Sequence, residues 1–326
     1  MYNQAYLCSV KFKWVPLFLI VLLGCIWGSS FFLIKRGLLV FSPIQVAGLR
    51  LFFAGIVLVP WIYRYSFGSK STIINKQTGT LESLIKRKDY LFLFLIGLLG
   101  NAIPAFLFSK AGELIPSGLS GILNAFTPIF TLILGILLYK EKATKNGLYG
   151  VFVGVLGAVF LLGPSILGQK GMHLNLDGVL MALLASMLYG YNINLIKIKL
   201  AHIPPMAKTA FPFFFMAIVY AFVLWRTDVW GTFQAHNELP NGEWLPLNQK
   251  ALGCLILLGV LGSAISMVLF NYLIEHTTAL VASTNTFIIP IVAVAWGLID
   301  HEAIQWNMVA GLALSLVGVY LVMKKK

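Results

Sequence analysis

Apolar residues along this chain come in long runs, and polar residues cluster in the short segments between them. A helix rises about 1.5 Å per residue, so about 20 apolar residues cross the hydrocarbon core of a bilayer. Ten such spans are expected, at residues 14–34, 43–63, 90–109, 117–138, 147–163, 178–196, 206–225, 251–273, 279–299 and 304–323. The pattern predicts an all-α integral membrane protein, and no segment between the spans is long enough for a separate soluble domain.

Two of the predicted spans are interrupted by a proline among polar residues. Pro128 would release the carbonyl of Asn124 from its helical hydrogen bond, and Pro290, 162 residues later, would release that of Thr286. Broken polar turns at corresponding places in two halves of a chain are typical of a transporter binding site. The alternative is that both prolines are packing kinks whose freed carbonyls are satisfied by neighbouring Ser and Thr side chains.

The offset of 162 residues holds over most of the chain. Residues 27–57 align without a gap with 189–219, and 99–139 with 261–301, and each stretch contains ten identities. After a slip of one residue, Glu141 matches Glu302. The alignment predicts two five-helix repeats, residues 1–163 and 164–326. Because five is odd, the second repeat must enter the membrane from the opposite side, so the repeats are inverted, as in alternating-access transporters.

Composition and charge agree with a membrane protein. Hydrophobic residues make up 59% of the chain and charged residues 11%, against about a quarter in soluble domains. The net charge of +13 does not indicate nucleic acid, because 17 of the 24 Lys and Arg residues fall on one side of the predicted topology and 6 on the other. That bias predicts a multi-pass cell (inner) membrane protein with both termini in the cytoplasm.

Several motifs resemble a known family. They are Trp27-Gly-Ser-Ser, Arg50-Leu-Phe-Phe-Ala-Gly, Thr127-Pro128, and Tyr139-Lys-Glu141 leading to Gly150-x-x-x-Gly154-x-x-Gly157. They are similar to the EamA-type members of the drug/metabolite transporter superfamily, and the resemblance covers nearly the whole chain. It implies a ten-helix inverted repeat that moves small organic solutes such as amino acids, metabolites or drugs, without a shared cofactor. The second half departs from the pattern, with Tyr189 in place of Trp27 and Pro212 in place of Arg50.

Polar and aromatic residues inside the spans are the candidate substrate-binding residues. They are Trp27, Ser30, Arg50, Asn101, Asn124, Tyr189, Asn192, Asn285 and Thr286, with Pro128 and Pro290 as candidate gating breaks. Amides and hydroxyls should face the bundle, where they either hold helices together or line a cavity. Arg50 is the one charge well within a span, and it could hold a substrate carboxylate or act as a structural lock. The small residues of the fifth and tenth spans, Gly150, Gly154 and Gly157 with Gly311, Ser315 and Gly318, predict close helix packing.

The competing class is an integral membrane enzyme acting on a lipid-like substrate. The five histidines and three cysteines show no metal-ligand spacing and no nucleophile–base pair, so no catalytic residue, metal or cofactor is expected. No acidic residue is placed in the middle of a span, which favours an exporter working as a facilitator or exchanger over one with a carboxylate proton relay. The expected partners are a small-molecule solute and the lipid bilayer, and a homodimer is compatible with the sequence.

The charge bias makes a testable prediction about topology. Met1 and Lys326 should be inside the cell and the 226–250 segment outside. Single cysteines introduced at position 326 and in the 226–250 segment should differ in labelling by an impermeant thiol reagent on intact cells, with only the latter reacting. Strong labelling at position 326 would reject this orientation.

Overall fold

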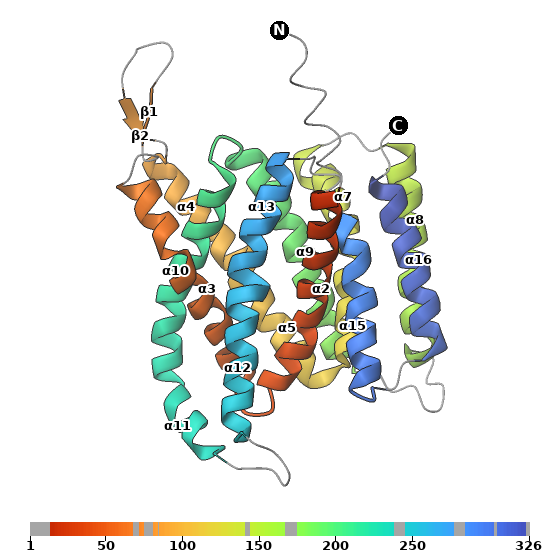
Figure 1. Ribbon diagram of the computed structural model, residues 1–326. Helices are drawn as coiled ribbons and strands as arrows, with labels where there is room; N and C mark the ends of the chain where they lie inside the picture. The colour runs from red at the N-terminus through yellow and green to blue at the C-terminus, as the bar shows by residue number, and fades with distance from the viewer. Residues whose placement is uncertain are drawn as a thin grey trace.

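The computed structural model describes residues 14–67, 72–74, 81–83, 85–140, 144–166, 175–237, 245–276, 284–302 and 305–323. The helices lie side by side in one bundle (Figure 1). In chain order the elements are α2 (Trp14–Gly37), α3 (Pro43–Ser66), β1 (Thr72–Ile74), β2 (Leu81–Ser83), α4 (Arg87–Gly97), η1 (Leu98–Ala102), α5 (Ile103–Leu114), α6 (Ser117–Asn124), α7 (Thr127–Tyr139), α8 (Lys145–Ile166), α9 (Leu176–Lys199), α10 (Pro205–Arg226), α11 (Val229–Ala235), α12 (Leu247–Gly259), η2 (Val260–Ile265), α13 (Ser266–His276), η3 (Thr284–Phe287), α15 (Ile288–Ile299) and α16 (Trp306–Met323).

The helices overlap the apolar spans expected from the sequence. Seven helical segments are long and apolar enough to cross a membrane: Trp14–Gly37, Pro43–Ser66, Arg87–Leu114, Ser117–Tyr139, Leu176–Lys199, Pro205–Arg226 and Leu247–Leu273. Three shorter apolar helices, Lys145–Phe160, Asn285–Ile299 and Trp306–Val322, overlap the other three expected spans. The beginning of the expected span 279–299 lies outside the described residues.

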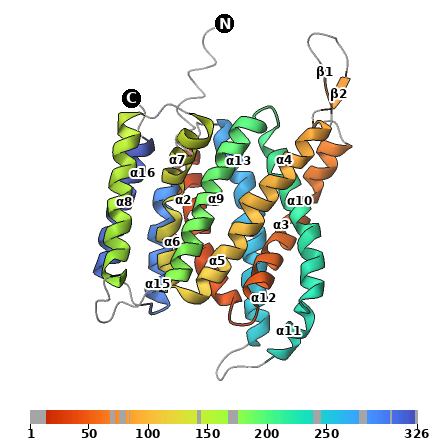
Figure 2. The same ribbon diagram turned by 180° about the vertical axis from the view of Figure 1, so that it is seen from behind.

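Two helix pairs make the most extensive contacts, α3 with α10 and α8 with α16. A methyl group added at Gly55 would lie 2.4 Å from Cβ of Ala217, so the first pair crosses closely there. The second pair lies at one side of the bundle (Figure 2). A methyl group at Gly150 would lie 2.6 Å from the carbonyl oxygen of Gly318, so the close packing predicted from the small residues of these two helices is confirmed.

Two long helices contain a short π-helical segment, which the sequence did not predict. Segment η1 joins α4 to α5, and η2 joins α12 to α13. Each follows a glycine that packs against another helix's backbone: a methyl group at Gly97 would lie 2.8 Å from the Pro212 carbonyl oxygen, and one at Gly259 would lie 2.7 Å from that of Arg50. Gly97 and Gly259 are 162 residues apart, as are Arg50 and Pro212, so the same contact occurs once in each half of the chain.

The two ends of the bundle differ in what they carry. The hairpin of β1 and β2 lies at the top of Figure 1, whereas α11 and the lower ends of α2, α5 and α15 lie at the bottom. At the lower end α3 begins after Ser42, whose backbone N–H donates to Oε1 of Gln45 at 3.0 Å. At this end, the last turn of α2 and the segment after α15 bring together charged residues that are far apart in the sequence.

Candidate functional site

The helix containing Pro128 is interrupted rather than kinked. Segment α6 ends at Asn124, and α7 begins at Thr127, so Pro128 is the second residue of a new helix. A proline fits the first turn of a helix, because the N–H that it lacks has no helical acceptor there. The freed carbonyl of Asn124 accepts a hydrogen bond from the Thr127 hydroxyl at 2.8 Å. The partner that the sequence analysis required for this carbonyl is therefore an adjacent threonine.

Helix α9 supplies further partners to the broken helix. Ser186 Oγ donates to the Leu123 carbonyl at 3.1 Å, and Asn194 Nδ2 donates to the Thr131 carbonyl at 2.9 Å. Asn194 and Ser186 are both buried. These two side chains hold the interruption against α9, which is the role of helix glue rather than of substrate binding.

The second proline occupies an equivalent place. The 3-10 turn η3 precedes α15, and Pro290 is the third residue of α15. Within the turn, the Thr286 hydroxyl makes a long hydrogen bond of 3.5 Å to Oδ1 of Asn285. Asn285 is 3% exposed. Both prolines therefore stand in the first turn of a helix that follows an irregular polar turn.

Three candidate amide side chains carry a buried polar atom without a hydrogen-bond partner among the described residues. The atoms are Oδ1 of Asn124, Oδ1 of Asn192 and Nδ2 of Asn285. Most buried polar side-chain atoms in folded proteins have a partner, so three exceptions among the candidates call for an explanation. Asn124 and Asn192 lie on α6 and α9, which pack on each other, whereas Asn285 lies in η3, which packs on α2 and α15.

Segment η2 gathers three other candidates. Trp27 Nε1 lies 3.1 Å from the Gly262 carbonyl oxygen and 3.0 Å from Oγ of Ser266, so it is anchored to η2 and to the start of α13. Arg50 Nε donates to Oγ of Ser263 at 2.8 Å. A methyl group added at Gly262 would lie 3.2 Å from the hydroxyl oxygen of Ser30. Short π-helical segments within α-helices often occur at functional sites.

Segment η1 gathers the corresponding residues of the other half. Asn101 lies within it, and a methyl group added at Gly100 would lie 2.0 Å from Nδ2 of Asn192. Ser30 and Asn192 are related by the offset of 162, as are Gly262 and Gly100. Ser30 and Asn192, which are equivalent in the two repeats, therefore pack on equivalent glycines of the two π-helical segments.

Tyr189 completes an aromatic wall beside Arg50. Its ring stacks on Phe108 with centroids 5.9 Å apart, and Phe108 meets Phe31 edge-on at 5.4 Å. Tyr189 and Arg50 are neighbours in the interior of the bundle. The structure thus brings Trp27, Ser30 and Arg50 together around η2, and Tyr189 of α9 packs on Phe108 nearby. Asn124 and Asn285 belong to the helix interruptions.

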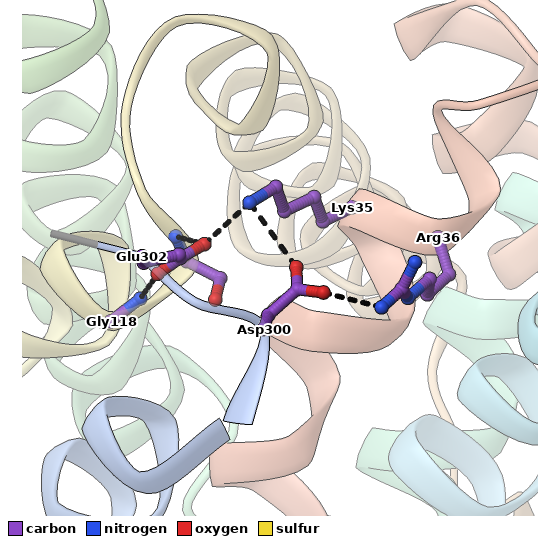
Figure 3. Close-up of polar contacts among 6 residues, drawn as sticks. Lys35, Arg36, Gly118, Asp300 and Glu302 are labelled. Carbon is purple, nitrogen blue, oxygen red and sulfur yellow. Dashed lines mark hydrogen bonds and ion pairs between the residues drawn. The ribbon is translucent and has the colours of Figure 1, made fainter. Parts of the chain in front are cut away.

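A charged cluster at the lower end of the bundle was not among the predicted site residues (Figure 3). Lys35 Nζ, near the end of α2, lies 2.7 Å from Oε1 of Glu302 and 3.2 Å from Oδ2 of Asp300, and Arg36 pairs with Asp300. The Glu302 carboxylate also accepts hydrogen bonds from the first two N–H groups of α6, Ser117 at 2.8 Å and Gly118 at 3.1 Å. The cluster ties α2, α6 and the segment after α15 to one another.

The Glu302 carboxylate is stabilised in its charged form. Burial alone would raise the pKa of Glu302, but the hydrogen bonds from Lys35, Ser117 and Gly118 outweigh it and hold the pKa below its usual value. A helix N-terminus favours a negative charge, which adds to the same effect. The repeat alignment pairs Glu302 with Glu141 and Lys35 with Lys197. These two identities were the only feature of the repeat that could have pointed to this cluster. Glu141 lies outside the described residues.

Glu113 and Glu275 follow the expected spans 90–109 and 251–273, so they are the acidic residues that a shift of one helical turn would bring into the membrane. Glu113 lies in the last turn of α5 and pairs with Lys110 on the surface. The side chain of Glu275 lies outside the description. In the described residues, no group of three or more His, Cys, Asp or Glu side chains could hold a metal ion.

Comparison with known proteins places this geometry in context. An uncharacterized transporter of Archaeoglobus fulgidus is 26% identical over 317 residues, which cover 96% of this chain and 99% of that protein. The uncharacterized inner membrane transporter YedA of Escherichia coli K12 is 26% identical over 87% of this chain and 82% of its own. A probable amino-acid metabolite efflux pump of Salmonella typhimurium is 27% identical over 173 residues, or 52% of this chain and 49% of that protein.

A solved crystal structure has the same fold, with a TM-score of 0.55 at 15% identity over 93% of this chain and 94% of its own. The EamA-like transporter family matches twice, over residues 14–163 and 176–324. Together these two matches cover nearly all of the chain. The chain is a multi-pass membrane protein and belongs to the EamA-like transporter family.

Proposed function

We propose that this protein exports small organic solutes, such as amino acids, metabolites or drugs, by alternating access. The observation that carries the proposal is a set of three buried amide atoms, on Asn124, Asn192 and Asn285, that have no hydrogen-bond partner among the described residues. A solute that bonds to these atoms would satisfy them, whereas a purely structural role leaves them costly. The Salmonella relative, a probable amino-acid metabolite efflux pump, supports this solute class and direction.

The binding residues proposed from the sequence are retained. Trp27, Ser30, Asn101, Arg50 and Asn192 lie on or beside the two π-helical segments, with Tyr189 near Arg50. Asn124, Asn285 and Thr286 lie at the interrupted turns. Pro128 and Pro290 begin the helices that follow these turns, so a change of angle between half-helices would act on both sites of interruption. Because the amide atoms are buried, a solute reaches them only when helices separate.

The proposed architecture is ten helices in two inverted repeats, residues 1–163 and 164–326. Two observations support it. The family matches twice in tandem, and the contact of Gly97 with Pro212 recurs as that of Gly259 with Arg50 at the same offset. Under the charge bias, both termini are cytoplasmic in the inner membrane and the cluster of Lys35 and Glu302 faces outward.

The charged cluster is proposed to close the outer side. It joins α2, α6 and the end of α15, so it must open if α6 and α15 are to part from α2. The carboxylate of Glu302 accepts hydrogen bonds from three donors, so opening the cluster means breaking these bonds. A transporter with this closure would expose its central residues inward while the cluster is intact.

The central test is solute counterflow in proteoliposomes. Purified protein should exchange an internal unlabelled solute for an external labelled one, at fixed membrane potential, with no accumulation above equilibrium when a pH gradient is imposed. The physical reason is that no carboxylate is placed at mid-membrane to relay a proton. Accumulation driven by the pH gradient and abolished by Glu113→Gln or Glu275→Gln would show proton coupling instead. Flux without counterflow would indicate a channel, and turnover of lipid would indicate an enzyme.

Neutralising Glu302 should open the outer closure. The labelling site is Ser120→Cys, introduced into a protein without its native cysteines, because Ser120 is buried in α6 one turn beyond Ser117 and Gly118. Glu302→Gln should raise its labelling by an impermeant external thiol reagent about tenfold, which corresponds to about 1.4 kcal/mol. Glu113→Gln is the matched control, because Glu113 also pairs with a lysine but on the surface, where such pairs contribute little.

The pH dependence of this labelling has a definite sign. The Glu302 pKa is lowered, so the cluster contributes fully above the usual glutamate pKa of about 4.3 and is lost as pH falls through the lower folded value. Labelling should therefore be constant from pH 6 to 8. A rise in labelling within that range, or equal labelling of the Glu302→Gln and Glu113→Gln variants, would contradict the proposed closure.

A further inference from the structure

Arg50 lies deep in the bundle, but its side chain is not fully covered. It is the seventh residue after Pro43 at the lower end of α3, so it lies about 10 Å into the helix at 1.5 Å per residue. Its side chain is partly exposed. It bonds to Ser263 of η2 and has Tyr189 of α9 as a neighbour, so the guanidinium lies among the helices of the bundle.

The guanidinium group is only partly used by the protein. Its Nε donates to the Ser263 hydroxyl at 2.8 Å, and among the described residues no acceptor is bonded to its two terminal amino groups. A guanidinium has five N–H donors, so four remain. With Nε engaged, the edge formed by the two terminal nitrogens stays free, and that edge can bind a carboxylate through two parallel hydrogen bonds.

No carboxylate of the described chain neutralises this charge. The ion pairs there use Lys35, Arg36, Lys110 and His202, and none uses Arg50. Of the eleven acidic residues, none falls in the middle of a span. A desolvated ion without a counter-ion is costly, and ionisable residues within membrane helices are usually paired. The described residues therefore supply no counter-ion for Arg50.

The surroundings of the free edge are fixed and aromatic. Trp27 is held to η2 by two hydrogen bonds, and Tyr189 is stacked on Phe108. Trp27 shares the η2 segment with Arg50, and Tyr189 is a neighbour of Arg50. An organic acid whose carboxylate reaches Arg50 would therefore place its apolar body near these rings.

We propose that Arg50 is the anion subsite of the transport site, and that the solutes of this protein carry a carboxylate. This inference rests on the proposed transport function and names its solute class: amino acids and small organic acids, with the acid group on Arg50 and an apolar body against Trp27 and Tyr189. The competing role, a structural lock between α3 and η2, uses only the bond to Ser263 and leaves the terminal amino groups without a purpose.

Counterflow with matched pairs of solutes tests the subsite. The probes are a mixture of the neutral L-amino acids and small monocarboxylic acids, and the carboxamide of each. Wild-type protein should exchange the acids at least tenfold faster than their amides. Arg50→Lys keeps the charge but loses the paired hydrogen bonds, so it should slow the acids about tenfold or more while changing the amides little. Arg50→Gln should remove the preference for acids.

Two further variants separate the subsite from a structural lock. Ser263→Ala removes the protein's own contact to Arg50 but keeps its charge, so the preference for acids should persist even if all rates fall. Lys110→Gln, which changes a surface cation on α5, is the control for loss of one positive charge and should keep both rates and preference.

The outcomes distinguish the two proposals. Wild-type exchange of amides as fast as acids, or equal losses for acids and amides in Arg50→Lys, would overturn the anion subsite and leave transport standing. Absence of exchange for every probe in folded wild-type protein would count against the proposed function itself. If Arg50→Gln does not fold, the comparison of Arg50→Lys with Ser263→Ala decides the question.

Discussion

A helix that ends inside a bilayer leaves peptide carbonyl and N–H groups without water to bond, and each must find a partner within the protein. The interruption between α6 and α7 meets this demand with side chains. Thr127 bonds to the Asn124 carbonyl, and Ser186 and Asn194 of α9 bond to carbonyls on either side of the break. The interruption is thus held in place without using the side-chain oxygen of Asn124, which stays available.

The π-helical segments act in a similar way on the other side of the bundle. Segment η2 presents the Gly262 carbonyl and the Ser263 hydroxyl to Trp27 and Arg50, which come from different helices of the first half. Those bonds orient two large side chains toward the interior. A regular α-helix at η2 would point these groups in other directions, because a π-helical turn holds more residues than an α-helical one and so changes the rotation of the chain. Irregular backbone therefore positions the candidate residues in both regions.

The sequence predicted the spans and the places of the two breaks, because hydropathy and proline are local signals. It did not predict that Pro128 begins a new helix, since a proline in an apolar run fits a kink or an interruption equally well. The π-helical segments carry no distinctive residues, and their form depends on helices meeting at Gly97 and Gly259. The cluster around Glu302 depends on α2, α6 and the end of α15 being neighbours, which only the folded bundle determines.

The Glu302 carboxylate and the Arg50 guanidinium differ in how many hydrogen-bond partners the protein gives them. At the lower end of the bundle, the Glu302 carboxylate has a lysine and two backbone N–H donors, so nothing further is needed to stabilise it. Within the bundle, Arg50 has one hydroxyl partner and an adjacent phenol. A saturated ion pair resists opening and suits a closure, whereas an unsaturated cation attracts an anion and suits a binding site. The same chemical type of interaction can thus hold one end shut and recognise a solute at the centre, depending only on whether the chain itself supplies the opposite charge.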